Sequence, residues 1–224
     1  MSSLYLSNYD ELVDLIAKTI KDVVDKRQCP GKEQGYDIPV GVSVRHLHIT
    51  DEVLHMLYGE DYQLTKLKDL EQPGEFAAHE TVTLVGPRMK SIQNVRILGP
   101  TRSFTQVELS KTDGILLGLD LPIKVSGDIK GSLPITLVGP KGSVYLREGA
   151  IRAARHIHIT PEIAKKINVR DKQVVNVQIP GEAGIIFNNV IIRVNEKYKL
   201  EFHIDTDEGN AADVGDNTFC KILK

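Results

Sequence analysis

The 224-residue sequence predicts a mainly β fold made of barrels or sandwiches, with an internal repeat and few helices. Two observations carry this prediction. Short apolar runs with strand character are separated by Gly-Pro turns, and one such run, at residues 81–87, is echoed at residues 134–140. A nine-residue phrase also occurs twice, at residues 45–53 and 155–163, with six of its nine positions identical.

The composition is that of an ordinary globular protein, with 41% hydrophobic and 26% charged residues. A net charge of -2 and a pI near 6.4 give no electrostatic attraction for nucleic acid or for an anionic membrane. Trp is absent and aromatic residues make up 5%, so a stacking platform for single-stranded nucleic acid is not expected. We therefore expect no nucleic-acid partner.

Membrane and secretion signals are also missing from the sequence. It has no apolar run of about eighteen residues, and no basic segment followed by an apolar core at its N-terminus. Cys29 and Cys220 form neither a disulfide framework nor a Cys-rich zinc site. A location in the reducing cytoplasm, without membrane attachment, is the expectation that follows.

The chain begins with a predicted amphipathic helix at residues 4–27, followed by a polar, Gly-rich linker at residues 28–37. This helix either packs on the fold or acts as a detachable peptide that binds another protein. A strand at residues 38–49 then ends in the first His-x-His, and Thr50 caps a short helix. The second copy repeats this order, with Thr160 as the helix cap.

The repeated phrase points to metal binding. Residues i and i+2 of a strand face the same side, so His46 lies beside His48 and His156 beside His158. A histidine pair that is hydrogen-bonded at a strand end is the plainer interpretation of a single copy, but two near-identical copies favour metal ligands. In the wider repeat, Glu108 aligns with His158, which places a carboxylate at a ligand-equivalent position.

A sixth candidate ligand is His203, on the polar face of a strand at residues 200–205. Six ligands exceed one tetrahedral zinc site, but they suit two adjacent sites of three. Arg102 follows a Gly-Pro turn and could bind phosphate or an oxyanion, although a surface arginine is the alternative. The residues alone thus indicate a metal enzyme that acts on an anionic substrate.

Several separated motifs, in order, carry a resemblance to a known family. They are Val-Ser-Val-Arg-His-Leu-His-Ile-Thr, Thr-Leu-Val-Gly-Pro, Arg-Ile-Leu-Gly-Pro-Thr-Arg, Ala-Ala-Arg-His-Ile-His-Ile-Thr-Pro-Glu and His-Ile-Asp-Thr-Asp-Glu-Gly-Asn-Ala. Over residues 36–224 the chain resembles the phosphate propanoyltransferase family, the zinc-dependent phosphotransacylases associated with bacterial microcompartments. The reaction that this resemblance implies is acyl-CoA plus phosphate giving acyl phosphate plus CoA, reversibly, with propanoyl-CoA or acetyl-CoA as the short-chain substrate.

The resemblance also implies two tandem β-barrels capped by short helices. One barrel would comprise residues 36–46 plus 155–224, the other residues 47–154, and residues 1–35 would form an N-terminal helix and linker. Two zinc ions per chain would bind one triad each, namely His46, His48 and Glu108, and His156, His158 and His203. Arg102 would hold phosphate, with Ser126 as an accessory polar group. CoA would contact Ser43, Lys68, Arg96, Leu98, His203 and Asn210.

Partners and location follow from the same resemblance. Residues 4–27 would direct the chain to the shell or lumen proteins of a bacterial microcompartment, and the chain would form a homo-oligomer, most simply a dimer. Two other functions stay open at this point. Two zinc ions that activate phosphate could equally activate water in a thioester hydrolase, and a metal-stabilised scaffold protein would have no activity.

Overall fold

The computed structural model describes residues 36–223. The helix predicted at residues 4–27 lies outside the described residues, as does most of the linker that follows it. From Asp37 onward the chain forms one compact unit. Within the described residues this unit is mainly β, with short helices, and its strands close into two six-stranded barrels. The predicted fold class is therefore confirmed for this part of the chain.

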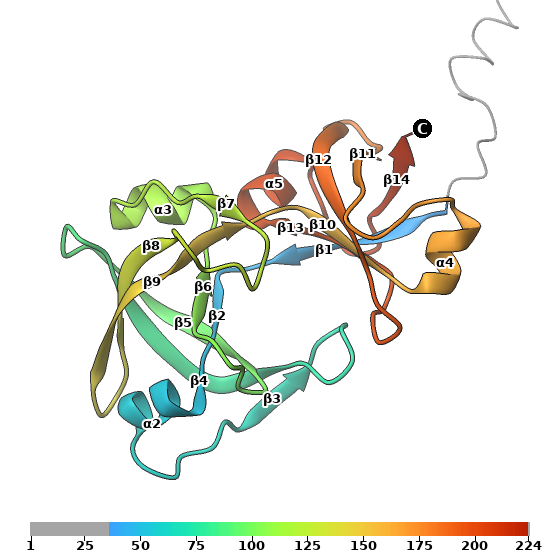
Figure 1. The fold of residues 1–224 in the computed structure, drawn as a ribbon. Coiled ribbons are helices and arrows are strands. Elements are labelled where there is room, and N and C mark those ends of the chain that lie inside the picture. The colour runs from blue at the N-terminus through green and yellow to red at the C-terminus, as the bar shows by residue number, and fades with distance from the viewer. Residues whose placement is uncertain (1–35, 224) are drawn as a thin grey trace, which may run out of the picture. The chain divides into compact units, whose positions relative to one another are not determined.

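The first barrel joins the earliest strand of the described region to the last ones (Figure 1). It closes because β1 pairs in parallel with β13 on one side and antiparallel with β14 on the other. In order around the barrel, its strands are β1 (Ile38–Ser43), β13 (Glu201–Asp205), β10 (His156–Ile159), β12 (Ile185–Val194), β11 (Val174–Ile179) and β14 (Phe219–Leu223).

The second barrel is formed by the middle of the chain and closes where β8 pairs with β4. Its strands, in order around the barrel, are β4 (Phe76–Val85), β5 (Ser91–Gly99), β2 (His46–His48), β6 (Gln106–Glu108), β9 (Ser143–Ala153) and β8 (Leu133–Val138). Two further strands extend this sheet, β3 (Lys66–Asp69) beside β4 and β7 (Ile123–Lys124) beside β9.

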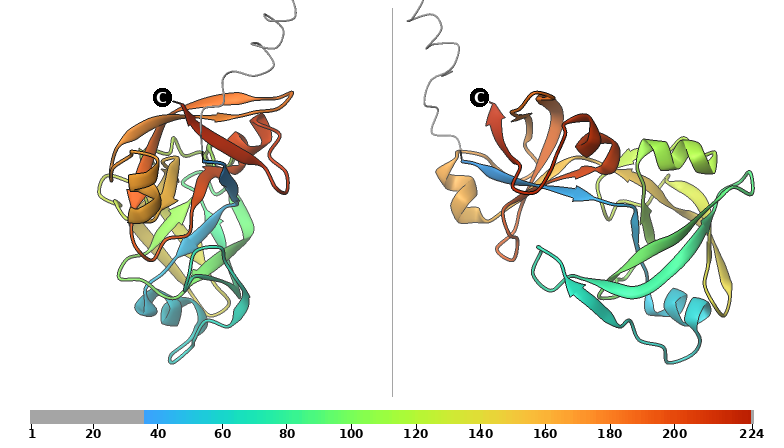
Figure 2. Two further views of the ribbon diagram at one scale, coloured as in Figure 1. Left: turned by 90° about the vertical axis from the view of Figure 1, so that its right-hand side faces the viewer. Right: turned by 180° about the vertical axis from the view of Figure 1, so that it is seen from behind.

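Two chain crossings connect the barrels. The chain leaves the first barrel at the end of β1 and enters the second at β2, and it returns from β9 to β10 (Figures 1 and 2). Each crossing runs directly into a His-x-His strand, because β2 begins at His46 and β10 begins at His156. The histidine strands therefore lie where the barrels meet.

Strand pairing defines the internal repeat more clearly than the sequence does. β2 pairs antiparallel with β6, which places His46 opposite Glu108, and β10 pairs in the same way with β13, which places His156 opposite His203. The structural counterpart of Glu108 is therefore His203. The sequence alignment that placed Glu108 with His158 was wrong, because it compared β6 with β10 itself rather than with β13, the pairing partner of β10.

Four short helices follow the paired strands, and polar caps set where they begin. α2 (Asp51–Tyr58) and α4 (Pro161–Lys166) follow the His-x-His strands and are capped by the hydroxyls of Thr50 and Thr160, as the sequence predicts. α3 (Lys111–Leu117) follows β6, and α5 (Thr206–Ala211) follows β13, each with a capping box. None of these helices has the length and apolar character needed to cross a bilayer.

The arginine at the start of each repeated phrase forms an equivalent ion pair in the two halves of the repeat. Arg45 Nη2 lies 2.9 Å from Asp113 Oδ1 in α3, and Arg155 Nε lies 2.7 Å from Glu208 Oε1 in α5. Both acids are the third helical residue of a capping box, so each also holds the start of its helix. The two ion pairs fix the arginine end of each His-x-His strand against the helix that follows its antiparallel partner strand.

Candidate active site

The middle residue of each His-x-His anchors the strand in a barrel core. Leu47 packs in the apolar core of the second barrel and Ile157 in that of the first, and both side chains are fully buried. Because neighbouring residues of a strand face opposite sides, the two imidazoles of each pair face away from that core. The fold thus directs all four imidazoles toward the junction between the barrels.

Two clusters of ligand-type side chains result. His46, His48 and Glu108 form one cluster, and His156, His158 and His203 form the other. Within each cluster, one potential ligand atom from each residue lies within 4.8 Å of the others. The structure therefore brings together the same two triads that the family resemblance implies. Two other histidines of the described region, His55 in α2 and His79 in β4, belong to neither cluster.

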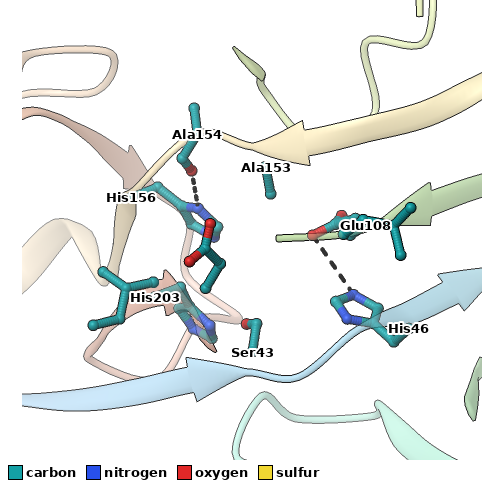
Figure 3. A pocket seen from close by; sticks show the side chains of 10 residues that line it. Ser43, His46, Glu108, Ala153, Ala154, His156 and His203 are labelled. Carbon is teal, nitrogen blue, oxygen red and sulfur yellow. Dashed lines mark hydrogen bonds and ion pairs between the residues drawn. The ribbon is translucent and has the colours of Figure 1, made fainter. Parts of the chain in front are cut away.

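The first cluster contains a carboxylate held by several hydrogen bonds. Glu108 Oε1 accepts a hydrogen bond of 2.6 Å from the amide of Gln106 and another of 2.6 Å from the hydroxyl of Ser126. Its Oε2 lies 3.6 Å from His46 Nε2 (Figure 3). Burial alone would raise the pKa of Glu108, but His46 and Ser126 outweigh it, so the pKa of this carboxyl lies below its ordinary value. Glu108 is therefore a carboxylate at neutral pH.

Backbone carbonyls orient the first histidine of each pair. His46 Nδ1 is 2.9 Å from the carbonyl oxygen of Val44, and His156 Nδ1 is 2.8 Å from that of Ala154 (Figure 3). With Nδ1 donating to these oxygens, Nε2 of each ring keeps a free lone pair. A second hydrogen bond of this kind commonly fixes the tautomer of a metal-binding histidine.

The second cluster is a stack of aromatic rings. The ring of His203 is parallel to that of His156 at 5.0 Å, and the ring of Tyr198 stacks on His158 at 4.1 Å. Glu201 Oε2 lies 3.0 Å from His203 Nε2, although that nitrogen makes no hydrogen bond of good geometry. The same carboxylate oxygen, Glu201 Oε2, accepts a 2.9 Å hydrogen bond from the side-chain amide of Gln72. Gln72 comes from the second barrel, so both barrels support this cluster.

Several imidazole nitrogens are buried without a hydrogen-bond partner. They include Nδ1 of His48 and both ring nitrogens of His158. Burial, together with neighbouring imidazoles, lowers the pKa of His48 and of His156 to about 3, and that of His158 to about 2. These rings are therefore neutral near pH 7. Orphaned, neutral nitrogens beside a carboxylate are the donor set that zinc binds, so the residues fit the metal implied by the resemblance.

A cavity of about 990 Å³ opens onto both clusters. Both histidine pairs, Glu108 and His203 line it. Of the seven other residues that the sequence and the family resemblance predict for the site, six also line it: Ser43, Lys68, Arg96, Leu98, Arg102 and Ser126. Asn210 is the exception, because it is exposed on α5 and does not line this cavity. A smaller cavity of about 20 Å³ lies directly between Glu108 and the pair His156 and His203 (Figure 3).

Arg102 is the charged side chain of greatest interest in the cavity wall. Its Nη2 donates to Glu75 Oε1 at 2.6 Å, in a half-buried ion pair. Arg96, by contrast, donates to the carbonyl oxygens of Ala78 and His79. Glu75 lies just before β4, and no local sequence pattern distinguishes it from other acidic residues.

Three more residues of this site were missed. These residues, Gln72, Arg193 and Tyr198, line the cavity. Their loops and strands approach the cavity only in the folded structure, so the sequence alone does not place them there. Glu201 lies two residues before His203 and so shares its strand face, but the sequence does not show the contact of its carboxylate with that ring.

Comparison with known proteins gives one consistent result. The family model described as phosphate propanoyltransferase matches residues 39–215. A phosphate propanoyltransferase of Lachnoclostridium phytofermentans is 50% identical over 214 residues, covering 96% of this chain and 99% of the relative.

Two more relatives carry the same name. That of Thermotoga maritima is 50% identical over 182 residues (81% of this chain, 85% of the relative). That of Salmonella typhimurium is 45% identical over 201 residues (89% and 91%). The triads and the cavity lie within the matched region, and the match extends over most of the chain. The chain therefore belongs to the phosphate propanoyltransferase family.

Proposed function

We propose that this chain is a phosphate acyltransferase that converts a short-chain acyl-CoA, propanoyl-CoA or acetyl-CoA, and phosphate to acyl phosphate and CoA, reversibly. The observation that carries the proposal is the pair of three-residue donor clusters, which face one cavity together with Arg102. Membership of the family supports the acyl-transfer reaction. The two clusters support two zinc ions per chain, each with three protein ligands.

The protein's own residues would hold the metals in a defined way. His46, His48 and Glu108 would bind one zinc, and His156, His158 and His203 the other. Three ligands leave a coordination position open, and zinc bound in this way supplies Lewis-acid polarisation of substrate oxygens. Ser126 and Gln106 would keep the Glu108 carboxylate fixed through their hydrogen bonds to its Oε1.

Arg102 would bind the phosphate substrate. Its planar guanidinium can hold two phosphate oxygens at once, and in this structure it holds a carboxylate, that of Glu75, in the same cavity. A phosphate oxygen then forms a bond to the thioester carbonyl carbon, the C–S bond breaks, and CoA leaves as the thiolate. Arg102 would neutralise the negative charge that develops during this transfer.

The CoA moiety would lie along the second barrel. Lys68 on β3 and Arg96 on β5 line the cavity and offer positive charge to its phosphates, while Leu98 offers an apolar contact. Ser43 and His203 lie at the inner end of the same cavity, next to the clusters. Asn210 lies outside the cavity lining and would contact a part of CoA that extends beyond it.

The test is CoA release from propanoyl-CoA by the zinc-loaded protein with and without phosphate. We expect release only with phosphate, together with an equal amount of acyl phosphate trapped by hydroxylamine. Arg102→Ala should lower kcat by about 100-fold or more, since charge-stabilising donors contribute this much to catalysis. CoA release that is equally fast without phosphate would identify a thioester hydrolase instead. The absence of CoA release with any acyl-CoA would favour a scaffold protein without catalytic activity.

Location and assembly are further parts of the proposal. We place the protein in the cytoplasm, and specifically inside a bacterial microcompartment, with residues 4–27 as the segment that binds shell or lumen proteins. The family resemblance supports this placement. A homodimer is the simplest assembly, and light scattering at several protein concentrations tests it.

A further inference from the structure

Arg193 presents an uncompensated guanidinium to the substrate cavity. Four arginines line the cavity, and three of them are satisfied by protein oxygens: Arg45 by Asp113, Arg96 by two backbone carbonyls, and Arg102 by Glu75. Within residues 36–223, the guanidinium of Arg193 makes no hydrogen bond or ion pair; its central carbon lies 5.9 Å from the centre of the Tyr198 ring. Its side chain is only half-buried.

The position of Arg193 places this charge beside the second histidine cluster. β10 pairs in parallel with β12, and Arg193 is the register partner of His158. Register partners in neighbouring strands face the same side of the sheet, so both side chains face the cavity. The ring of Tyr198 stacks on His158, and the guanidinium of Arg193 lies over the same tyrosine ring. Arg193 therefore borders the site of reaction rather than the outer rim of the cavity.

An arginine lies at or just beyond the end of the strand that runs parallel to each histidine strand. β5 runs parallel to β2 as β12 runs parallel to β10, so β5 and β12 are counterparts. Arg102 follows the end of β5, and Arg193 is the next-to-last residue of β12. The charges of Arg102 and Arg193 both help to lower the pKa of His158, after its burial and the neighbouring imidazoles. The fields of the two guanidiniums thus overlap at the second cluster.

A partly buried cation without an acceptor is unfavourable, and an anion that enters the cavity would compensate it. The substrates offer one kind of anion, a phosphate group, either as inorganic phosphate or as part of CoA. The position of Arg193 favours inorganic phosphate over the phosphate groups of CoA. The basic residues proposed for CoA, Lys68 and Arg96, lie on β3 and β5 of the second barrel, whereas Arg193 lies on β12 of the first.

We propose that Arg193 binds inorganic phosphate from the first barrel, as a second guanidinium besides Arg102, whereas the basic residues proposed for CoA, Lys68 and Arg96, lie on the second barrel. This inference rests on the proposed acyltransferase function. It assigns to Arg193 the holding and orientation of the attacking phosphate, so its loss should weaken phosphate binding much more than acyl-CoA binding. Lysine at this position keeps the charge but not the planar two-point contact, and should restore binding in part.

The experiment compares Arg193→Gln and Arg193→Lys with the wild-type protein. Arg170→Gln is the matched control, because Arg170 is exposed in the same barrel and lies outside the cavity lining. With saturating propanoyl-CoA, we expect Arg193→Gln to raise the KM for phosphate by about 10- to 100-fold, the range for a lost charge-assisted contact. The lysine variant should show a smaller rise, and the KM for propanoyl-CoA should change by less than about twofold.

The affinity for phosphate can also be measured directly, without catalytic turnover. Calorimetric titration of the zinc-loaded proteins with inorganic phosphate should show the same loss of affinity in Arg193→Gln, with unchanged metal content and circular dichroism. An unchanged phosphate affinity, or a rise in the KM for propanoyl-CoA alone, would overturn the inference, and the latter would assign Arg193 to CoA. Wild-type protein that releases CoA without phosphate would instead refute the proposed function itself.

Discussion

A single apolar residue directs each pair of candidate ligands. Leu47 and Ile157 are buried in separate barrel cores, and their histidine neighbours consequently face the junction. Carbonyl oxygens of Val44 and Ala154 then orient the first imidazole of each pair. The side-chain directions in both clusters are thus fixed by backbone geometry and packing, before any ligand is bound.

Ser126 is expected to strengthen metal binding at the first cluster without contacting the metal. Its hydroxyl donates to Glu108 Oε1 at 2.6 Å and fixes the carboxylate. Ser126→Ala should weaken zinc binding to this cluster by about 10- to 100-fold, as for other residues that support a ligand. Competition with a zinc-chelating dye measures this affinity. Ser91→Ala, at an exposed position on β5, is the control, and equal affinities in both variants would contradict the role.

Acid should destabilise the metal-free protein. The folded state keeps His48, His156 and His158 neutral, with pKa values of about 3, 3 and 2 against an ordinary value of 6.5. Below about pH 6.5 the unfolded chain therefore binds protons that the folded chain does not. The free energy of unfolding consequently decreases as the pH is lowered, until the pKa values of the folded state are reached. Each histidine contributes up to about 1.4 kcal/mol per pH unit.

Urea unfolding in the presence of a chelator, between about pH 7.5 and pH 4.5, measures this loss. His158→Gln should give a shallower decline, since one such histidine is removed. A stability that does not change over this range would show that the buried histidines protonate as readily in the folded state as in the unfolded one.

At the scale of elements, the loop between β3 and β4 joins the two barrels over the cavity. Gln72 Nε2 donates to Glu201 Oε2 at 2.9 Å and to the carbonyl of Lys199 at 3.1 Å, and Gln72 Oε1 accepts from the amide of Lys199 at 3.1 Å. An ion pair between Glu71 and Lys199 lies beside these bonds. The same loop ends at Glu75, the partner of Arg102. One loop therefore contacts residues next to both clusters.

Removal of Gln72 should lower the stability of the whole unit. Gln72→Ala leaves the buried Glu201 carboxylate without one of its donors, which should cost about 1–3 kcal/mol in the free energy of unfolding. Denaturant unfolding gives this value directly. Lys66→Ala in β3 removes only an exposed ion pair with Asp69 and should cost less than about 0.5 kcal/mol. Equal effects in the two variants would exclude a structural role for the loop contact.

The sequence predicts elements well where one local signal determines them. Alternating apolar residues identify the His-x-His strands, and Thr50 and Thr160 mark the starts of α2 and α4. The repeat register was misjudged because β6 and β13 share little sequence, and only their antiparallel pairing with β2 and β10 shows that they correspond.

The candidate site divides in the same way. Both triads follow from histidine spacing and family resemblance, whereas Glu75, Gln72 and Arg193 do not. Each of these three depends on a contact between segments that are far apart in the chain, such as the 127-residue separation between Gln72 and Lys199. No local pattern in the sequence carries this information.

At the scale of the whole described region, the two barrels are joined covalently and by contacts. β1 and β9 each complete one barrel and then continue into a histidine strand of the other. Thr112 of α3 also donates its amide to Asp207 of α5 at 2.7 Å. Each cluster lies on two paired strands of a single barrel, and the chain enters each histidine strand directly from the other barrel.

Residues 1–35 should be dispensable for catalysis. All residues of the two clusters and of the cavity lining lie after residue 40. A chain that begins at residue 36 should therefore keep the kcat of the full-length protein and lose only the association with microcompartment proteins that we propose for residues 4–27. Turnover and co-sedimentation with purified shells measure these two properties. Insoluble or inactive protein after this deletion would show that the N-terminal segment belongs to the catalytic fold.

The central claim is that two metal ions, one in each cluster, support phosphate-dependent acyl transfer. The most direct measurement is zinc titration of the metal-free protein, with metal content per chain and phosphate-dependent CoA release followed in the same samples. We expect about two zinc ions per chain, one for each triad, with full activity only when both are bound. Full activity of the metal-free protein would contradict the central claim, as would full activity of a Glu108→Gln variant that binds only one zinc ion.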